Sequence, residues 1–177
     1  MTKFAVLAAA VGVLIWAAPA RAAETKVELK NVHMCCEGCA EEVAAILKTV
    51  AGVTGVTVDQ KATTARFTAA DAKAAQKALD ALAEGGFHGD TGGAKDFAFK
   101  DDSGVKAGKV KSLNVTGFHN SCPGCVKSFR AAIKDVPGVT GATLKAKVSE
   151  AEVSGEFDAA ELVKALNKAG FHVKVKE

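Results

Sequence analysis

The sequence predicts an α+β protein made of two tandem copies of one βαββαβ unit. Three features occur twice along its 177 residues: a C-x-x-C pair, a V-x-G-V-T-G segment and a G-F-H tripeptide. They lie at Cys36–Cys39 and Cys122–Cys125, at 50–55 and 136–141, and at 86–88 and 170–172. The offset is 86 residues for the first two features and 84 for the third. This regular spacing indicates a duplicated structural unit.

In the second copy, a strand leads into the cysteine loop and a helix follows it. Leu113 and Val115 alternate with polar residues, as in a half-buried strand. The helix carries one apolar stripe, and Pro137-Gly138 ends it. The stripe consists of Val126, Phe129, Ile133 and Val136. Two short strands are then expected over 139–144 and 148–153.

The second copy closes with another helix and a strand. Asp158 and Glu161 form a capping box at the start of the helix, whose apolar face recurs at helical spacing. That face carries Leu162, Ala165, Leu166 and Ala169. The last strand is expected over 171–175. The order strand, helix, strand, strand, helix, strand is that of a ferredoxin-like sandwich.

The first copy follows the same plan as far as its second helix. Val27 and Leu29 predict the first strand, and the middle strands are expected over 53–58 and 64–67. The first helix has its apolar stripe at Val43, Ile46, Leu47 and Val50. An alanine-rich second helix is expected from 71 to 84.

The last strand of the first copy is less regular. Gly89, Gly92 and Gly93 weaken a strand at the matching position, so Phe97–Lys100 is an alternative segment for that edge. A turn signal at 101–104 places the boundary between the copies near Gly104. The predicted domains are therefore 23–104 and 105–177.

The first 22 residues have the pattern of a secretory signal peptide. Lys3 precedes an apolar run, and Ala20-Arg21-Ala22 is a small-x-small cleavage site. The run is shorter than the roughly 20 apolar residues that span a bilayer. We therefore expect cleavage after Ala22 and a periplasmic or secreted product without a membrane span.

The cysteines are informative in an oxidising compartment, where thiols normally pair unless a metal or a redox cycle uses them. Each C-x-x-C pair is predicted to lie in the loop before a helix N-terminus, where the helix dipole favours thiolate over thiol. Soft thiolates select Cu(I), Hg(II), Zn(II) or Cd(II) over hard cations. An incomplete two-thiolate site suits a carried ion better than a structural one.

The segment M-C-C-E-G-C at 34–39 resembles the M-x-C-x-x-C metal loop of the heavy-metal-associated domain family. That family includes copper chaperones, N-terminal modules of metal-pumping P-type ATPases and an exported mercuric-ion-binding protein. The resemblance implies metal binding at Cys36, Cys39, Cys122 and Cys125. It favours Cu(I) or Hg(II) over Zn(II) or Cd(II), and it implies delivery to a heavy-metal P-type ATPase or another transporter.

Two aromatic residues and one asparagine also bear on this resemblance. Phe87 and Phe171 resemble the family's aromatic residue that packs beside the metal loop. The second copy departs from the family because Asn120 stands where the buried Met is expected, with Pro123 inside its C-x-x-C pair. The departure puts the geometry of the second loop in question.

Cys35 and the four histidines are further candidates for metal contact. The preferred interpretation of Cys35 is an exposed thiol without a role. The alternatives are a third metal ligand and a resolving thiol. The histidines occupy positions that match between the copies, at the ends of predicted strands near the metal loops. They are His33 with His119, and His88 with His172. The alternative interpretation is ordinary polar residues at strand ends.

The two copies carry opposite net charge. Residues 23–104 contain 9 basic and 13 acidic residues, a net charge of −4, whereas 105–177 contain 12 basic and 7 acidic residues, a net charge of +5. Glu37, Glu41 and Glu42 flank the first cysteine pair, and Lys127 and Arg130 flank the second. One hypothesis is that these charges steer the two metal loops together. The alternative is two ordinary solvated faces.

The sequence therefore predicts a non-enzymatic, exported carrier or scavenger of a soft metal ion. No catalytic triad, phosphate-binding glycine loop or nucleic-acid module is expected. Two alternatives stay open: a thiol-disulfide oxidoreductase, because a C-x-x-C pair at a helix N-terminus is also redox chemistry, and an interaction module with degenerate metal sites.

Overall fold

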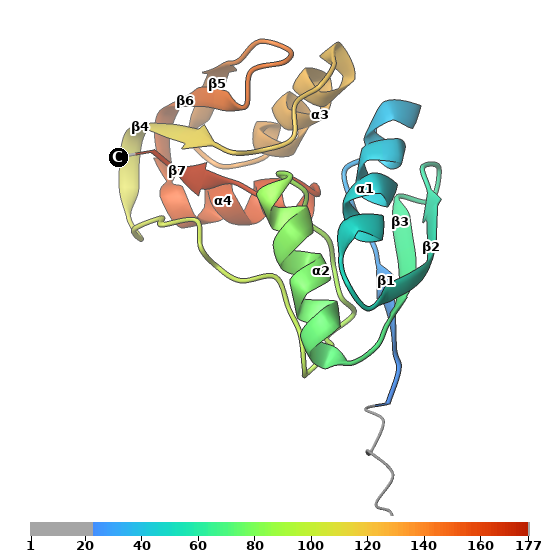
Figure 1. Ribbon diagram of the computed structural model, residues 1–177. Helices are drawn as coiled ribbons and strands as arrows, with labels where there is room; N and C mark the ends of the chain where they lie inside the picture. The colour runs from blue at the N-terminus through green and yellow to red at the C-terminus, as the bar shows by residue number, and fades with distance from the viewer. Residues whose placement is uncertain (1–22, 177) are drawn as a thin grey trace, which may run out of the picture.

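The computed structural model describes residues 23–176 as two halves, each with two helices and one antiparallel sheet (Figure 1). The first half contains β1 (Thr25–Leu29), α1 (Glu37–Thr49), β2 (Val53–Asp59), β3 (Thr64–Ala69) and α2 (Ala72–Glu84). The second contains β4 (Lys109–Thr116), α3 (Pro123–Lys134), β5 (Val139–Thr143), β6 (Glu150–Asp158), α4 (Ala159–Lys168) and β7 (Lys174–Val175). The expected signal peptide, 1–22, lies outside the described residues.

The second half has the expected ferredoxin-like order. Its four-stranded sheet runs β5-β6-β4-β7, and α3 and α4 pack against each other and against the sheet. The last strand is shorter than the predicted 171–175, because only Lys174 and Val175 pair with β4. Phe171 instead forms an isolated antiparallel bridge with Phe87 of the first half. The start of the predicted strand is thus diverted into a contact between the halves.

The first half has the same order but lacks a regular fourth strand. Its sheet runs β1-β3-β2, and the position beside β1 is reduced to one bridge between Lys30 and Asp90. Gly92 and Gly93 follow at φ of 66° and 78°, a left-handed conformation that turns the chain away from the sheet. Phe97–Lys100 forms no strand, so this alternative for the edge is wrong.

Both second helices begin where the sequence places them. Asp71 precedes α2 and accepts a hydrogen bond from the Ala74 backbone N–H at 2.6 Å. Asp158 precedes α4 and accepts from the N–H groups of Ala160 and Glu161 at 2.9 and 3.0 Å. These bonds satisfy N–H groups that have no partner inside the helix, and they fix the start of each helix.

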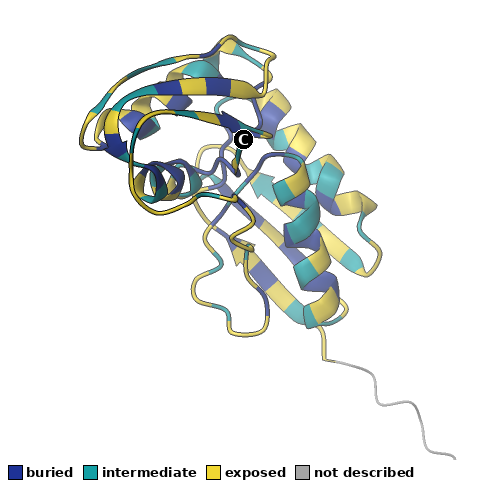
Figure 2. Cartoon of the chain, turned by 90° about the vertical axis from the view of Figure 1, so that its left-hand side faces the viewer, coloured by how far each residue is buried: buried dark blue, intermediate teal, exposed yellow. Residues whose placement is uncertain are grey.

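Each half has its own hydrophobic core, and buried residues alternate with exposed ones along its helices and strands (Figure 2). The cysteine region belongs to the first core. Leu29, Leu47 and Phe67 are typical members of the first core, which also includes Cys125 from the second half. Phe129 is typical of the second core. The first core therefore extends into the second half at the cysteine loops.

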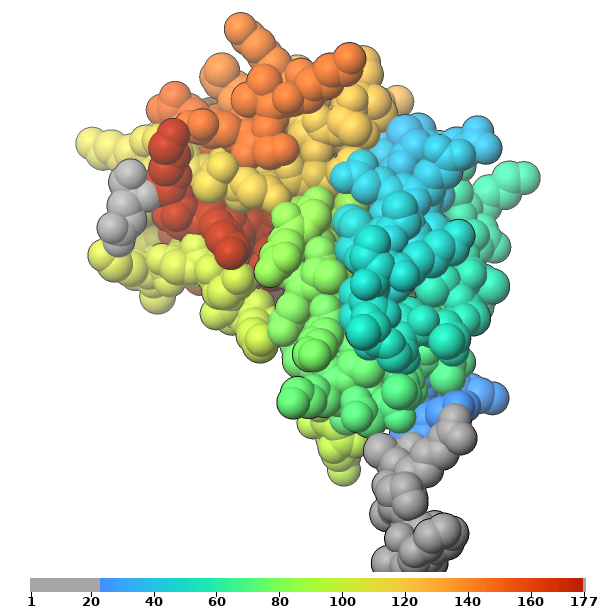
Figure 3. All heavy atoms as spheres, in the orientation of Figure 1, coloured from blue at the N-terminus to red at the C-terminus, as the bar shows by residue number. Residues whose placement is uncertain are grey.

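The two halves lie against each other in the space-filling view (Figure 3). The backbone N–H of His119 donates to the Gly86 carbonyl at 3.1 Å, and that of His88 donates to the Gly170 carbonyl at 2.9 Å. His172 donates its N–H to the Gly86 carbonyl at 3.0 Å. These contacts join equivalent segments of the duplication in a reciprocal way. Across the described residues, none of the helices has the length and apolar character needed to cross a membrane.

Candidate metal centre

The two C-x-x-C pairs lie at the N-termini of α1 and α3. Cys36 and Cys122 precede these helices in extended conformation, with φ of −152° and −147°. Cys39 and Cys125 lie in the first turn and are almost fully buried. Three-residue spacing across a helix start therefore brings both sulfurs of a pair beside the positive end of the helix.

The structure brings these four sulfurs together in one cluster. Within the halves, Cys36 Sγ lies 3.4 Å from Cys39 Sγ, and Cys122 Sγ lies 3.7 Å from Cys125 Sγ. Between the halves, the Cys36–Cys122 and Cys39–Cys125 sulfur distances are 3.8 and 3.9 Å. All five cysteines are free thiols. The two predicted sites therefore form a single centre shared by the halves.

Cys35 lies in the middle of this cluster rather than on the outside. Its Sγ is 3.6 Å from Cys39 Sγ and 3.5 Å from both Cys122 Sγ and Cys125 Sγ. The side chain is partly buried. The first-choice interpretation of an exposed thiol is wrong, because the second half covers this residue.

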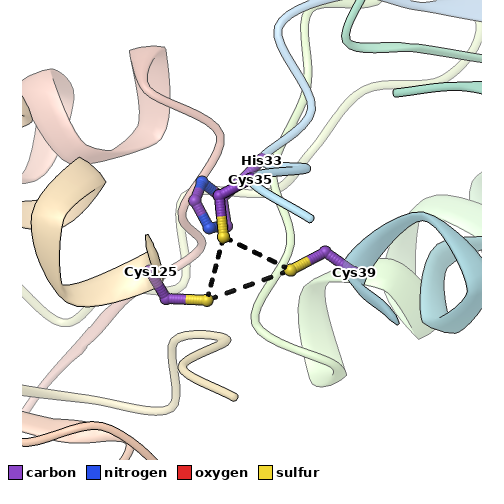
Figure 4. A group of neighbouring side chains, drawn as sticks. All are labelled: His33, Cys35, Cys39 and Cys125. Carbon is purple, nitrogen blue, oxygen red and sulfur yellow. Dashed lines mark hydrogen bonds between the residues drawn. The ribbon is translucent and has the colours of Figure 1, made fainter. Parts of the chain in front are cut away.

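His33 is the histidine nearest the sulfurs. One of its ring nitrogens lies within 4.8 Å of the sulfurs of Cys35, Cys39 and Cys125 (Figure 4). The ring stacks on Phe171 of the other half with centroids 4.1 Å apart, and the residue is only 5% exposed. Its Nε2 has no hydrogen-bond partner among the described residues. A buried ring with one nitrogen beside three thiols is suited to ion or thiolate contact.

His119 takes the matching place in the second half. Its ring stacks on Phe87 with centroids 4.3 Å apart. Nε2 lies 3.0 Å from Ser121 Oγ, and Nδ1 lies 3.5 Å from a carboxylate oxygen of Glu42. The aromatic residue after each second helix therefore packs on the histidine of the opposite half.

His88 and His172 lie apart from the thiols, so the predicted metal contact is wrong for this pair. They stack on each other with centroids 5.8 Å apart, and His88 also stacks on Phe99. Asp102 lies 2.7 Å from His172 Nε2. Burial, reinforced by the neighbouring His172, lowers the pKa of His88 to about 4. This pair belongs to the packing between the halves.

The thiols differ in acidity because they compete for donors. A hydrogen bond from Cys39, followed by those from His119 and His33, lowers the pKa of Cys125 despite its burial. The contact with Cys125 and burial raise the pKa of Cys39. The Cys39 backbone N–H lowers the pKa of Cys36, whereas burial raises that of Cys35. The cluster thus contains thiols of unequal acidity.

The sulfur positions fit a thiophilic ion. Cys35, Cys39 and Cys125 form a triangle with sides of 3.5 to 3.9 Å, whose centre lies about 2.1 Å from each sulfur. A thiolate–zinc bond measures about 2.3 Å, so a small outward adjustment would admit a soft ion. A second group, Cys35, Cys36 and Cys122, also has all its sulfurs within 4.8 Å of one another.

Comparison with known families agrees with this donor set. The sequence model of the heavy-metal-associated domain matches residues 121–172. The match includes the second cysteine pair. No curated protein matches the chain.

Similar solved structures come from two bacteria. The N-terminal domain of PacS from Synechocystis PCC6803 is 28% identical, with 38% of this chain and all of that chain covered and a TM-score of 0.34. The N-terminal soluble domains of Bacillus subtilis CopA are 18% identical, with 88% of this chain and 95% of that chain covered and a TM-score of 0.30.

The asparagine in the second metal loop has a structural role that the sequence did not reveal. Asn120 is 5% exposed, and its Nδ2 donates to the carbonyls of Lys145 and Val148 at 2.8 Å each. It therefore ties the metal loop to the loop between β5 and β6. Because the amide holds the loop from within, the substitution of the expected Met still allows Cys122 and Cys125 to converge.

Proposed function

We propose that this protein is a non-enzymatic, exported carrier or scavenger that holds a thiophilic ion between its two halves. The observation that carries the proposal is the cluster of five free thiols at two helix N-termini, with sulfur contacts of 3.4 to 3.9 Å. The match of 121–172 to a heavy-metal-associated domain supports it.

The donor set supports Cu(I) or Hg(II) as the cargo. The ligands are polarisable sulfurs and one imidazole, which bind soft ions in preference to Mg²⁺ or Ca²⁺. Two helix N-termini stabilise the negative charge that accumulates when several thiols lose their protons. Zn(II) and Cd(II), which also accept thiolates, are the competitors that an affinity measurement must include.

The unequal burial of the sulfurs suggests how an ion is passed on. Cys36 and Cys122 are partly exposed, whereas Cys39 and Cys125 are almost fully buried. An incoming thiolate of a partner can reach the ion beside an exposed cysteine and replace it, through a three-coordinate intermediate, before the buried ligands release. No electron transfer is required. A heavy-metal P-type ATPase or another transporter is the proposed receiver.

The opposite net charges of the two halves are a further part of the proposal. The acidic first half and basic second half are proposed to attract each other and to hold the metal loops together. The ion pair of Lys174 with Asp102 at 3.1 Å is consistent with attraction between the halves. The test is the salt dependence of ion transfer between separately supplied halves. Transfer that is equally fast in low and high salt would rule out steering.

The central test is an anaerobic competition among Cu(I), Hg(II) and Zn(II) for the reduced protein. We expect Cu(I) or Hg(II) to displace Zn(II), and we expect Cys39→Ser and Cys125→Ser to weaken binding strongly. Ser112→Ala, a change of an exposed residue on β4, is the matched control. Absence of bound ion, or binding that survives both cysteine changes, would overturn the carrier function.

The same purified sample separates a carrier from an oxidoreductase. We expect five thiols per chain once the bound ions have been removed, with negligible disulfide exchange towards a reduced or oxidised peptide. Rapid exchange without metal binding would support the redox alternative instead. Cell fractionation tests the proposed export.

A further inference from the structure

We propose that the centre holds two thiophilic ions bridged by the sulfur of Cys35. The inference rests on the proposed function and specifies the ligands. The repeat by itself implies one ion on each C-x-x-C pair, four cysteines in all. The fifth cysteine changes this arrangement, because it lies between the pairs rather than beside one of them.

The sulfurs form two groups of three that have Cys35 in common. The first group is Cys35, Cys39 and Cys125, with His33 beside it, and the second is Cys35, Cys36 and Cys122. Five thiols can supply two three-sulfur sites only if one thiol serves both. Cys35 is the member placed for this, since its sulfur contacts both Cys122 and Cys125 at 3.5 Å.

Each of the two sites takes its ligands from both halves. In each group, at least one sulfur comes from each half. A single half contributes either three cysteines or two, so neither half alone can reproduce both groups. The bridged arrangement therefore depends on the docking of the halves.

Two ions on one sulfur lie close together. With bonds of about 2.3 Å to the shared sulfur, their separation stays below about 4.6 Å. Each ion replaces protons on the thiols that bind it, and these protons pass to solvent without a change of oxidation state. A metal–metal distance in this range that is lost when the Cys35 sulfur is removed distinguishes the bridge from two ions held by the C-x-x-C pairs alone.

The duplication provides a matched control for Cys35. Ser121 occupies the equivalent position, 86 residues later, and its Oγ lies 3.9 Å from Cys39 Sγ and 3.8 Å from Cys125 Sγ. A hydroxyl oxygen is a poor ligand for a soft ion. Cys35→Ser therefore removes the bridge, whereas Ser121→Ala changes the matching position without removing a sulfur.

A second pair of variants keeps all five cysteines. A Cβ at Gly124 would lie 2.9 Å from Cys35 Sγ and 3.3 Å from Cys122 Sγ, whereas one at the equivalent Gly38 would lie 3.9 Å from Cys36 Sγ. Both glycines are in helices, where alanine is well accommodated. Gly124→Ala should push the Cys35 sulfur out of its place, and Gly38→Ala should not disturb Cys36.

The experiment uses the purified reduced protein loaded with Cu(I) under argon, with native mass spectrometry for stoichiometry and X-ray absorption for a metal–metal distance. We expect two ions and a short metal–metal distance in the wild type, Ser121→Ala and Gly38→Ala. We expect one ion and loss of that distance in Cys35→Ser, and a reduced two-ion population in Gly124→Ala.

Two outcomes would overturn the bridge while leaving the carrier function intact. One is a wild type that binds a single ion, and the other is a Cys35→Ser variant that retains two close ions. Failure of the carrier function gives a different result, because the wild type then binds no Cu(I), or binds it regardless of Cys39 and Cys125. Circular dichroism of each variant verifies the fold.

Discussion

Gly86 limits how closely the two halves can approach. Gly86 has a φ of 79°, and a Cβ added there would lie 2.2 Å from the His119 backbone nitrogen and 2.5 Å from the Gly117 carbonyl oxygen. Both atoms are backbone of the second half, so no side-chain rotation relieves the contact. We therefore predict that Gly86→Ala forces the halves apart.

The effect on the thiols follows from the size of that shift. Ordinary contact begins at 3.4 Å, so the gap at Gly86 must open by about 1.2 Å. A similar movement at the cluster would lengthen the 3.8 Å Cys36–Cys122 distance to about 5 Å. One ion with bonds of about 2.3 Å spans at most about 4.6 Å between two sulfurs, so it would lose ligands from one half.

Loss of ligands from one half removes the advantage of a linked second binding unit. Such linkage strengthens binding by about 10² to 10⁴, or about 3 to 5.5 kcal/mol. We expect Gly86→Ala to lower the Cu(I) affinity by this factor in competition with a chelator. Alanine in a left-handed conformation also costs about 1 to 2 kcal/mol of folding stability, which thermal unfolding monitors.

Gly117→Ala is the matched control for this prediction. Gly117 also has a φ of 79°, but a Cβ there meets nothing within 4 Å. It should lose folding stability to a similar extent and keep its Cu(I) affinity. Equal affinities for the two variants would refute the conclusion that the halves must dock to form the centre.

Three further predictions concern thiol reactivity, acid stability and the second metal loop. Cys36 should be alkylated by iodoacetamide at pH 7 at least about tenfold faster than buried Cys39, because its pKa is lowered and its sulfur is partly exposed; peptide mapping that finds Cys39 equally reactive would contradict this. Folding lowers the pKa of His88 to about 4. The free energy of unfolding should therefore be highest above pH 6.5 and should fall by up to about 3 kcal/mol as the pH falls to 4. Denaturant unfolding should show that His88→Leu makes the free energy of unfolding less dependent on pH. An unchanged pH dependence would argue against this role of His88. Asn120→Leu should cost about 2 kcal/mol in thermal unfolding because the carbonyls of Lys145 and Val148 lose the hydrogen bonds from this buried amide; a neutral effect would exclude that role.

Local patterns predicted most elements because they depend on local physics. The helix starting after Asp71 follows from a side chain that bonds the first turn, and the stripe including Phe129 and Ile133 faces the core as expected. The metal loops were likewise predictable as pairs, since a three-residue spacing at a helix start fixes Cys36 beside Cys39. None of these conclusions needs information from the other half.

The shared centre could not be predicted because it depends on contacts between the halves. The face of His33 was ambiguous in the sequence, and the structure gives the reason: Asn31 has a φ of 56°, which breaks the strand alternation just before it. The predicted last strand of the second half was too long, because Phe171 pairs with Phe87 rather than with β4. The exposure of Cys35 likewise depends on the half that covers it.

The reciprocal packing links the binding of an ion to the docking of the halves. Phe171 stacks on His33, and Phe87 stacks on His119, so the segment after the second helix of each half supports the metal loop of the other. An ion that binds sulfurs from both halves adds its binding free energy to this contact, because it binds the docked form and not the separated one. Removal of the ion by a partner has the reverse effect and weakens the contact.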